Sequence, residues 1–155
     1  MHLRVGYPDV IAEQAILQLT RREAHQHAEN PDSVEELSQQ SLFSARDEVL
    51  DIHMADELER YLIEIVMATR EPARYHPDLQ RWIEYGASPR ATMSIDRCAR
   101  ASAWLADRDF VSPDDIQSVA HATLRHRIIL SYEAEADGVN TDQVIDRILQ
   151  LVAVP

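Results

Sequence analysis

The stretch Gly86-Ala87-Ser88-Pro89-Arg90-Ala91 decides how this 155-residue chain is interpreted, because it marks the start of a long helix. Serine is preferred just before a helix, and proline is favoured in the first helical turn because its φ angle is already helical. Small and apolar side chains then recur at helical spacing, namely Ala91, Ile95, Cys98, Ser102 and Leu105. The sequence therefore predicts a helix that begins at Pro89 and buries one face.

Arg90 stands in the first turn of this helix, which is the unfavourable end for a positive charge. The helix dipole disfavours a cation there by up to ~1 kcal/mol. The position makes sense if Arg90 and the helix N-terminus face a shared anion such as a phosphate. The alternative is a solvated arginine that tolerates the dipole, as surface charges often do. The residues alone leave both interpretations open.

Helical patterns also dominate the rest of the chain. Further helices are expected after Pro8, after the capping box of Ser33 and Glu36, from Asp56 to Thr69, after Ser112-Pro113 and after Thr141. Only Met1–Tyr7 reads as a strand, with Val49–His53 as a weaker candidate. We therefore expect a mostly α-helical bundle of five to six helices with a short N-terminal strand. A lone strand cannot satisfy its own backbone, so this strand needs a partner.

The composition argues against several classes of function. All 15 basic residues are arginine, against 27 acidic residues, and the formal net charge is −12. A Walker A loop and Schiff-base chemistry both need a lysine, which the chain lacks. The acidity disfavours broad nucleic-acid binding and docking on anionic membranes. The single cysteine, Cys98, excludes an internal disulfide, and no apolar run approaches the ~18 residues of a membrane span.

No metal site or catalytic cluster stands out. The pair His25 and His27 and the pair His121 and His126 are both poorly spaced to share a metal on a helix. The adjacent Asp114-Asp115 pair follows a helix start, where complementing the helix dipole is favoured over a catalytic role. An enzyme built on a helical bundle would need carboxylates or histidines clustered at metal-binding spacing. We therefore expect no metal site.

Several blocks of the sequence, taken in order, match one known family. They are Tyr61-Leu62-Ile63, Ala68-Thr69-Arg70, Gly86 to Ala91, Ala99-Arg100-Ala101, Arg108 with Phe110-Val111, Pro113 to Ile116, and His126-Arg127-Ile128. Together they resemble the C-terminal lid of MoxR-type AAA+ ATPases. The opening Arg4 to Pro8 resembles the last strand of that family's ATPase core. One departure is Asp107, where the family often has glycine, so the resemblance leaves the geometry of that loop open.

The resemblance implies a role for the first motif. Arg90 is expected to be the second-sensor arginine, which reaches the terminal phosphate of ATP bound to the neighbouring core. The turn that presents it would consist of Gly86, Ala87, Ser88 and Pro89. The family's other nucleotide-binding motifs lie upstream of the lid, so ATP and Mg²⁺ are expected in a longer parent protein. This fragment alone is expected to be catalytically inert and to hold no cofactor tightly.

The resemblance also implies an organisation and partners. Residues 1–8 would be the last strand of the missing AAA+ core, residues 9–130 the helical lid domain, and residues 131–155 a C-terminal turn and helix. The partners would be that core, further copies in a ring-shaped hexamer, and von Willebrand A-domain proteins, with no nucleic acid and no membrane insertion. The parent would hydrolyse ATP as a chaperone-like remodelling or maturation factor. Because no signal peptide opens the chain, we expect a cytoplasmic location.

A second hypothesis is an acidic helical protein-interaction module without nucleotide chemistry. Its support would come from the last helix, whose apolar face runs from Val144 to Val152. If that face is exposed, it could bind a partner helix.

Overall fold

The computed structural model describes residues 1–25 and 36–155 of the chain. These residues form two compact units. The larger unit contains residues 43–155 together with Met1 and His2, and the smaller unit contains residues 3–25 and 36–42. The structure therefore divides the chain near residue 42 and keeps residues 131–155 with the helices that precede them.

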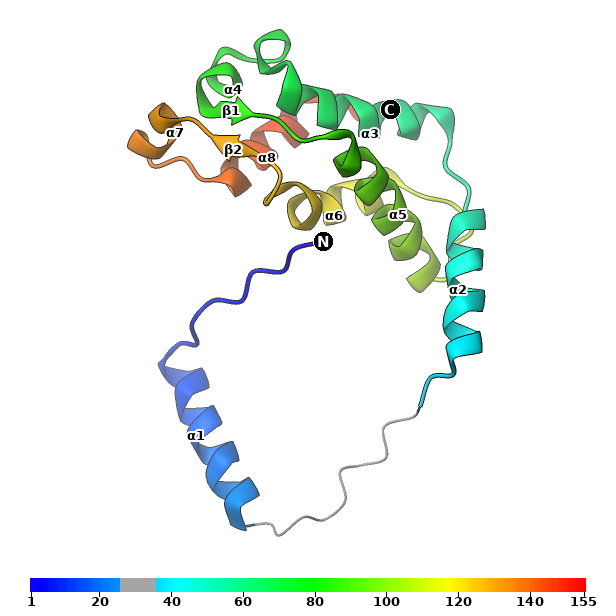
Figure 1. Cartoon of the computed structure of the whole chain (residues 1–155), viewed down its shortest axis with the longest axis vertical. Coiled ribbons are helices and arrows are strands. Elements are labelled where there is room, and N and C mark those ends of the chain that lie inside the picture. The colour runs from blue at the N-terminus through cyan, green and yellow to red at the C-terminus, as the bar shows by residue number, and fades with distance from the viewer. Residues whose placement is uncertain (26–35) are drawn as a thin grey trace. The chain divides into compact units, whose positions relative to one another are not determined.

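Most of the described residues are helical, which confirms the mostly α fold class (Figure 1). The helices are α1 (Val10–His25), α2 (Gln39–Asp51), α3 (Asp56–Arg70), the 3-10 turn η1 (Pro72–Arg74), α4 (Pro77–Trp82), α5 (Pro89–Leu105), α6 (Pro113–Leu124), α7 (Tyr132–Ala136) and α8 (Thr141–Leu151). The described residues thus form eight α-helices where five to six were predicted, because α4 and α7 have only 6 and 5 residues. Helices this short carry no periodic pattern from which to predict them.

The core of the larger unit lies between α3, α5, α6 and α8. Helix α5 contacts both α3 and α6, and α8 contacts α3, α4 and α6. Fully buried isoleucines from these helices belong to one cluster: Ile65, Ile95, Ile116, Ile145 and Ile148. Because burying an isoleucine stabilises a fold by about 1.5–3 kcal/mol, this cluster holds the four helices in a fixed arrangement.

Helix α8 is part of this core. Val144, Ile145 and Ile148 are fully buried, and Val152 is 6% exposed. The interaction-module hypothesis relied on this apolar face being open to a partner, and the structure shows that the chain's own helices cover it. A partner would therefore have to bind elsewhere.

A two-stranded antiparallel sheet joins two segments distant in sequence. It consists of β1 (Ile83–Tyr85) and β2 (Ile129–Leu130). The weak strand candidate at Val49–His53 was wrong, because that segment continues α2 to residue 51 and only His53 forms an isolated bridge, with Phe110. The sheet matters for function because β1 leads directly into the segment that starts α5.

The predicted N-terminal strand is not formed in the structure. Residues 1–9 carry no regular secondary structure, and the amide of His2 donates a hydrogen bond to the carbonyl oxygen of Ala122 at 2.6 Å. A strand needs a partner along its whole length to satisfy its backbone. In the smaller unit, α1 exposes its apolar residues, and Ile11 and Leu19 are 78% and 49% exposed.

The start of α2 differs from the sequence prediction. Ser33 of the expected capping box and His27 lie outside the described residues. Helix α2 begins at Gln39, and the hydroxyl oxygen of Ser38 accepts a hydrogen bond from the amide of Ser41 at 3.0 Å. Ser38 therefore caps this helix.

Candidate functional site

The segment between β1 and α5 passes unusually close to the end of α3. A Cβ atom built on Gly86 would lie 2.2 Å from the carbonyl oxygen of Thr69. The φ angle of Gly86 is not positive, so its conformation is open to other residues. Glycine is therefore required here by close backbone approach.

Ala87 is held through both of its backbone polar groups. Its amide donates to the hydroxyl oxygen of Thr69 at 2.9 Å, and its carbonyl oxygen accepts from Nε of Arg70 at 2.6 Å. Thr69 and Ala87 are each only 1% exposed. Two consecutive residues at the end of α3 thus fix the residue that precedes the cap of α5.

Helix α5 starts where the sequence predicts. Ser88 occupies the N-cap position with extended backbone, and Pro89 is the first helical residue. The Ser88 side chain makes no capping hydrogen bond, although its carbonyl oxygen accepts from the amide of Ala91 at 2.8 Å. The positive end of the helix dipole is therefore not offset by the serine that precedes it.

Arg90 lies exposed in the first turn of α5. Among the residues that the structure describes, none accepts a hydrogen bond from its guanidinium or pairs with it. Its backbone carbonyl accepts from the Ser94 hydroxyl at 2.7 Å, and Nη2 of Arg127 donates to that hydroxyl oxygen at 3.0 Å. The backbone beneath Arg90 is thus fixed while its side chain stays available.

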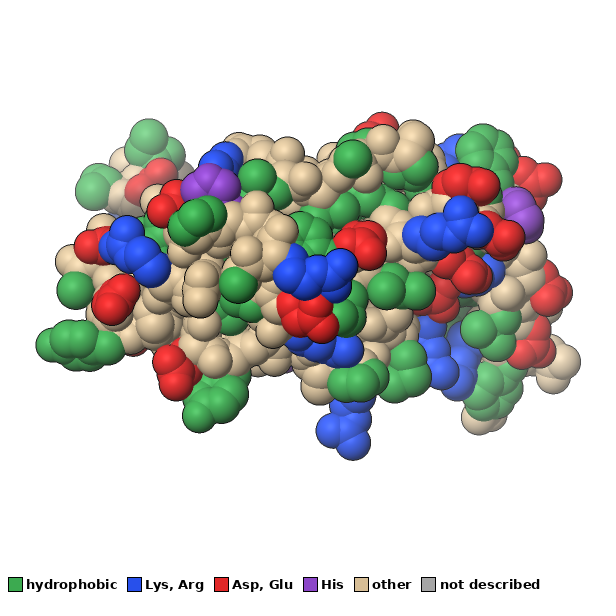
Figure 2. Space-filling model, turned by 90° about the horizontal axis from the view of Figure 1, so that it is seen from above, with side chains coloured by type: hydrophobic (Ala, Val, Ile, Leu, Met, Phe, Trp, Pro, Cys, Tyr) green, Lys and Arg blue, Asp and Glu red, His purple; other side chains and the backbone are tan. Residues whose placement is uncertain are grey.

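The charges of this acidic protein are well mixed, as the face in Figure 2 shows. Several arginines pair with carboxylates, namely Arg74, Arg81, Arg100, Arg108 and Arg125. Arg97 lies on α5 seven residues after Arg90, close to the same helix face, and is also exposed. It has no carboxylate partner in the described part of the chain, so it provides a matched comparison for Arg90.

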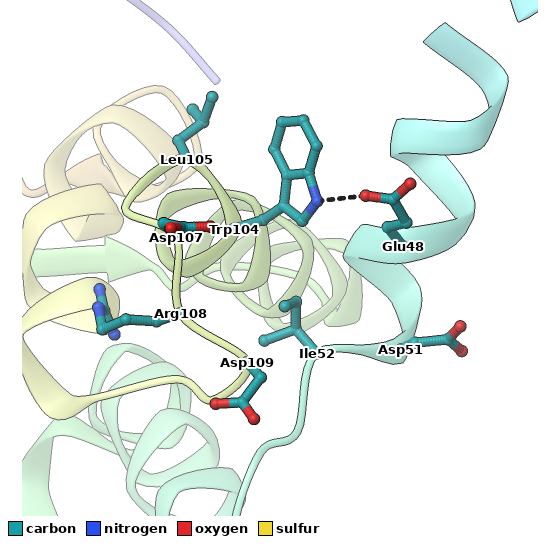
Figure 3. Close-up of a pocket in the computed structure, with 8 residues that line it drawn as sticks. All are labelled: Glu48, Asp51, Ile52, Trp104, Leu105, Asp107, Arg108 and Asp109. Atoms are coloured by element: carbon teal, nitrogen blue, oxygen red, sulfur yellow. Dashed lines mark hydrogen bonds between the residues drawn. The ribbon is translucent and has the colours of Figure 1, made fainter. Parts of the chain in front are cut away.

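The opposite end of α5 borders a pocket of about 730 Å³ (Figure 3). Nε1 of Trp104 donates to a carboxylate oxygen of Glu48 on α2 at 2.9 Å. Most of the other side chains that line the cavity are acidic or apolar: Asp51, Ile52, Leu105, Asp107 and Asp109. Asp107, where the resemblance left the loop geometry open, has a φ angle of 56°.

Arg108, in the loop between α5 and α6, forms an ion pair with Asp115 of α6. Its two Nη atoms donate to the two carboxylate oxygens of Asp115 at 2.8 and 2.7 Å. Burial by itself would raise the pKa of Asp115, but hydrogen bonds from Arg108, from the amide and hydroxyl of Ser112 and from Ser102 hold it well below its usual range. Asp115 also completes a capping box with Ser112. The sequence predicted only dipole complementation for Asp115 and missed this cluster.

Sequence reasoning also missed the contacts that hold the turn. Thr69 and Arg70 entered only as part of a family block, and nothing in the spacing of residues indicated that they contact Ala87. Within the described ranges, no three His, Cys, Asp or Glu residues come together as a metal site, and no helix is long and apolar enough to cross a bilayer.

Known sequences resemble this chain along nearly all of it. Residues 79–148 match the family described as the AAA lid domain. Chaperone MoxR1 of Mycobacterium tuberculosis is 34% identical over 154 residues, which are 99% of this chain and 39% of that protein. The uncharacterized protein YeaC of Bacillus subtilis is 34% identical over 153 residues, which are 99% of this chain and 44% of that protein. The chain thus spans less than half the length of these relatives.

A crystal structure gives the same result for the fold. A protein of Cytophaga hutchinsonii, described as a candidate ATPase, superposes with a TM-score of 0.85 at 38% sequence identity. The match covers 97% of this chain and 45% of that protein. Fold, sequence blocks and family match agree with the resemblance found in the sequence. The chain therefore contains an AAA lid domain of the MoxR type.

Proposed function

We propose that this chain is the nucleotide-sensing lid of a MoxR-type AAA+ ATPase. In this proposal ATP, with Mg²⁺, is bound by a core domain that the lid covers, and Arg90 donates hydrogen bonds to its terminal phosphate. The observation that carries the proposal is that Arg90 is exposed, and forms no ion pair with any residue that the structure describes, on a backbone fixed from both sides. An arginine at a helix N-terminus is well suited to bind a phosphate group.

The residues of the turn fit one phosphate contact and no more. Arg90 and the helix start supply positive charge, but the chain has no lysine to contact further phosphates. A charge-assisted hydrogen bond contributes up to ~3 kcal/mol, whereas a millimolar dissociation constant already requires about 4 kcal/mol. We therefore expect the isolated chain to bind ATP only weakly and to have no ATPase activity.

The rest of the proposal concerns the longer protein. Loss of the terminal phosphate on hydrolysis would remove the anion that Arg90 contacts, and the lid would then move as a rigid body. We include in the proposal a hexameric ring, chaperone-like remodelling or maturation of protein complexes, von Willebrand A-domain partners and a cytoplasmic location. Residues 1–8 would complete the core sheet, which would give this stretch the strand partner it lacks here.

The experiment begins with the reading frame upstream of the codon for Met1. A frame that stays open and encodes GxxxxGK[ST] would supply the ATPase core. In that longer protein, Arg90→Ala should lower ATP turnover by at least ~10-fold, because Arg90 stabilises charge on the transferred phosphoryl group. Arg97→Ala is the matched control and should leave turnover unchanged. A stop codon directly before Met1, or unchanged turnover in Arg90→Ala, would contradict the proposal.

The interaction-module hypothesis loses its specific support in this structure. Its proposed docking face on α8 is buried in the core of the larger unit. We therefore keep the lid as the proposed function.

A further inference from the structure

We infer that Thr69 is a positioning residue for Arg90, acting through Ala87 and the start of α5. This inference rests on the proposed function, because it concerns how Arg90 is held in place to contact a phosphate. Thr69 lies on α3 and Arg90 on α5, and the chain between them includes η1, α4 and β1. A direct link between the two helices at this point would fix the first turn of α5 relative to α3.

The first part of the argument is the hydrogen-bonding of the Thr69 hydroxyl. It donates to the carbonyl oxygen of Val66 at 2.7 Å within α3, which leaves its oxygen free to accept from the amide of Ala87 at 2.9 Å. The hydroxyl is thus oriented by its own helix before it accepts. Both Thr69 and Ala87 are buried, so water does not compete for this bond.

The second part is the close approach at Gly86. Its α-carbon lies against the backbone of Thr69, so the chain cannot move toward α3. The Thr69 hydroxyl and Nε of Arg70 oppose movement in the other direction, because each holds one polar group of Ala87. The segment is therefore fixed from both sides, three residues before Arg90.

A second buried threonine shows what the Thr69 arrangement adds. The Thr123 hydroxyl donates to the carbonyl oxygens of Val119 and Ala120 within its own helix, α6. No backbone amide from another element donates to it in the described part of the chain. Thr123→Val therefore removes a buried hydroxyl of the same kind without releasing another segment, which makes it the matched control.

The first measurement is amide hydrogen exchange on the 155-residue chain. Thr69→Val keeps the side-chain shape but leaves the amide of Ala87 without its acceptor, so exchange of that amide should become about tenfold faster or more. Thr69→Ser retains the hydroxyl and should restore slow exchange, and Thr123→Val should leave Ala87 unchanged. Unchanged exchange at Ala87 in Thr69→Val would overturn the inference.

The second measurement is a double-mutant cycle on ATP turnover in the longer protein. If Thr69 acts through Arg90, Thr69→Val should lower kcat by about tenfold with the KM for ATP little changed, because a contact strongest in the transition state is lost. Thr69→Ser should restore the rate. In an Arg90→Ala background, Thr69→Val should cause no further loss of kcat.

The outcomes separate the inference from the proposed function. Losses from Thr69→Val and Arg90→Ala that add fully would show that Thr69 does not act through Arg90, while the lid proposal would stand. An Arg90→Ala variant with unchanged turnover would remove the proposed function and the inference with it. In that case the exchange data would still report whether Thr69 holds Ala87.

Discussion

One arginine, Arg90, lies in the first turn of α5 and another, Arg108, lies in the loop that follows its last residue, and the two make opposite kinds of contact. At the C-terminal end, both Nη atoms of Arg108 bind the carboxylate of Asp115, which is only 4% exposed. At the N-terminal end, Arg90 is exposed and binds no side chain in the described ranges. There the chain is held at Gly86 and Ala87, by close backbone approach, by the Thr69 hydroxyl and by Nε of Arg70.

The difference shows how a helix start can be fixed while its arginine stays available. An ion pair is a strong way to close a loop on a helix, but it neutralises the charge of the arginine that makes it. Hydrogen bonds to the backbone of Ala87 and close approach at Gly86 fix this segment without using the side chain of Arg90. The ion pair is found in the loop between α5 and α6, and the backbone contacts are found where we propose that a phosphate binds.

The largest expected effect is near the C-terminal end of α5, where Arg108 pairs with Asp115. Asp115→Asn should lower the free energy of unfolding by about 3 kcal/mol, because it removes the charge of a buried carboxylate that accepts from Arg108, Ser112 and Ser102. Urea unfolding of the 155-residue chain would measure the loss. Asp114→Asn, at the exposed neighbouring position, is the control and should change stability little.

The same ion pair predicts a pH dependence. The pKa of Asp115 is lower in the folded than in the unfolded state, where it should be near its ordinary value of about 3.9. The unfolded state therefore binds more protons as the pH falls below about 4, and the stabilisation by Asp115 is lost as the pH approaches the folded-state pKa. Asp115→Asn should lose less stability over that range than the unaltered chain. Equal losses would remove Asp115 as a source of acid sensitivity.

The N-terminal end of α5 should be sensitive to the size of the side chain at position 86. Gly86→Ala should destabilise the chain by about 2 kcal/mol, because the new Cβ would overlap backbone atoms of Thr69 that cannot move aside alone. Gly6→Ala is the matched control, since a Cβ there meets no atom within 4 Å. Thermal unfolding of the two variants would separate close approach from a general preference for glycine.

A smaller effect on stability, of the opposite sign, is expected in the loop that follows α5. Asp107 has a φ angle of 56°, a left-handed conformation that costs an ordinary residue free energy and glycine very little. Asp107→Gly should therefore stabilise the chain by about 0.5–1 kcal/mol. The reverse test is Gly138→Ala, at φ 70°, which should destabilise by a similar amount. No gain from Asp107→Gly would mean that the aspartate side chain compensates for its backbone.

The smallest expected effect concerns Arg90 itself. Arg90→Ala should change the free energy of unfolding by no more than about 0.5 kcal/mol, as for other exposed positions. Arg97→Ala should behave alike. A large loss of stability in Arg90→Ala alone would mean that Arg90 serves the fold, and the contrast between the two ends of α5 would disappear.

The sequence predicted features that depend on neighbouring residues in the chain. The start of α5 at Ser88-Pro89 and that of α6 at Ser112-Pro113 follow from cap and first-turn preferences, and both were confirmed. The apolar stripe of α8 was also correctly predicted, but whether it was buried could not be. Burial depends on which helices pack against each other, and this packing depends on residues from the whole chain.

Contacts between segments distant in sequence could not be predicted from local patterns. The approach of Gly86 to Thr69 and the pair between β1 and β2 join residues that no local spacing connects. The same holds for Trp104 and Glu48, which lie on α5 and α2. Arg90 was found as a candidate because its position at a helix start violates a local rule. Thr69 violates none, so only the structure shows what it touches.

Helix α5 connects the turn that carries Arg90 to the pocket that Trp104 lines. With 17 residues, the helix is roughly 25 Å long, so a tilt of about three degrees at its start would move its far end by about 1 Å. The far end carries Trp104, one of two tryptophans in the chain, hydrogen-bonded to Glu48 across the cavity. The intrinsic fluorescence of this indole would therefore report any displacement of α5 relative to α2, and no dye would have to be attached.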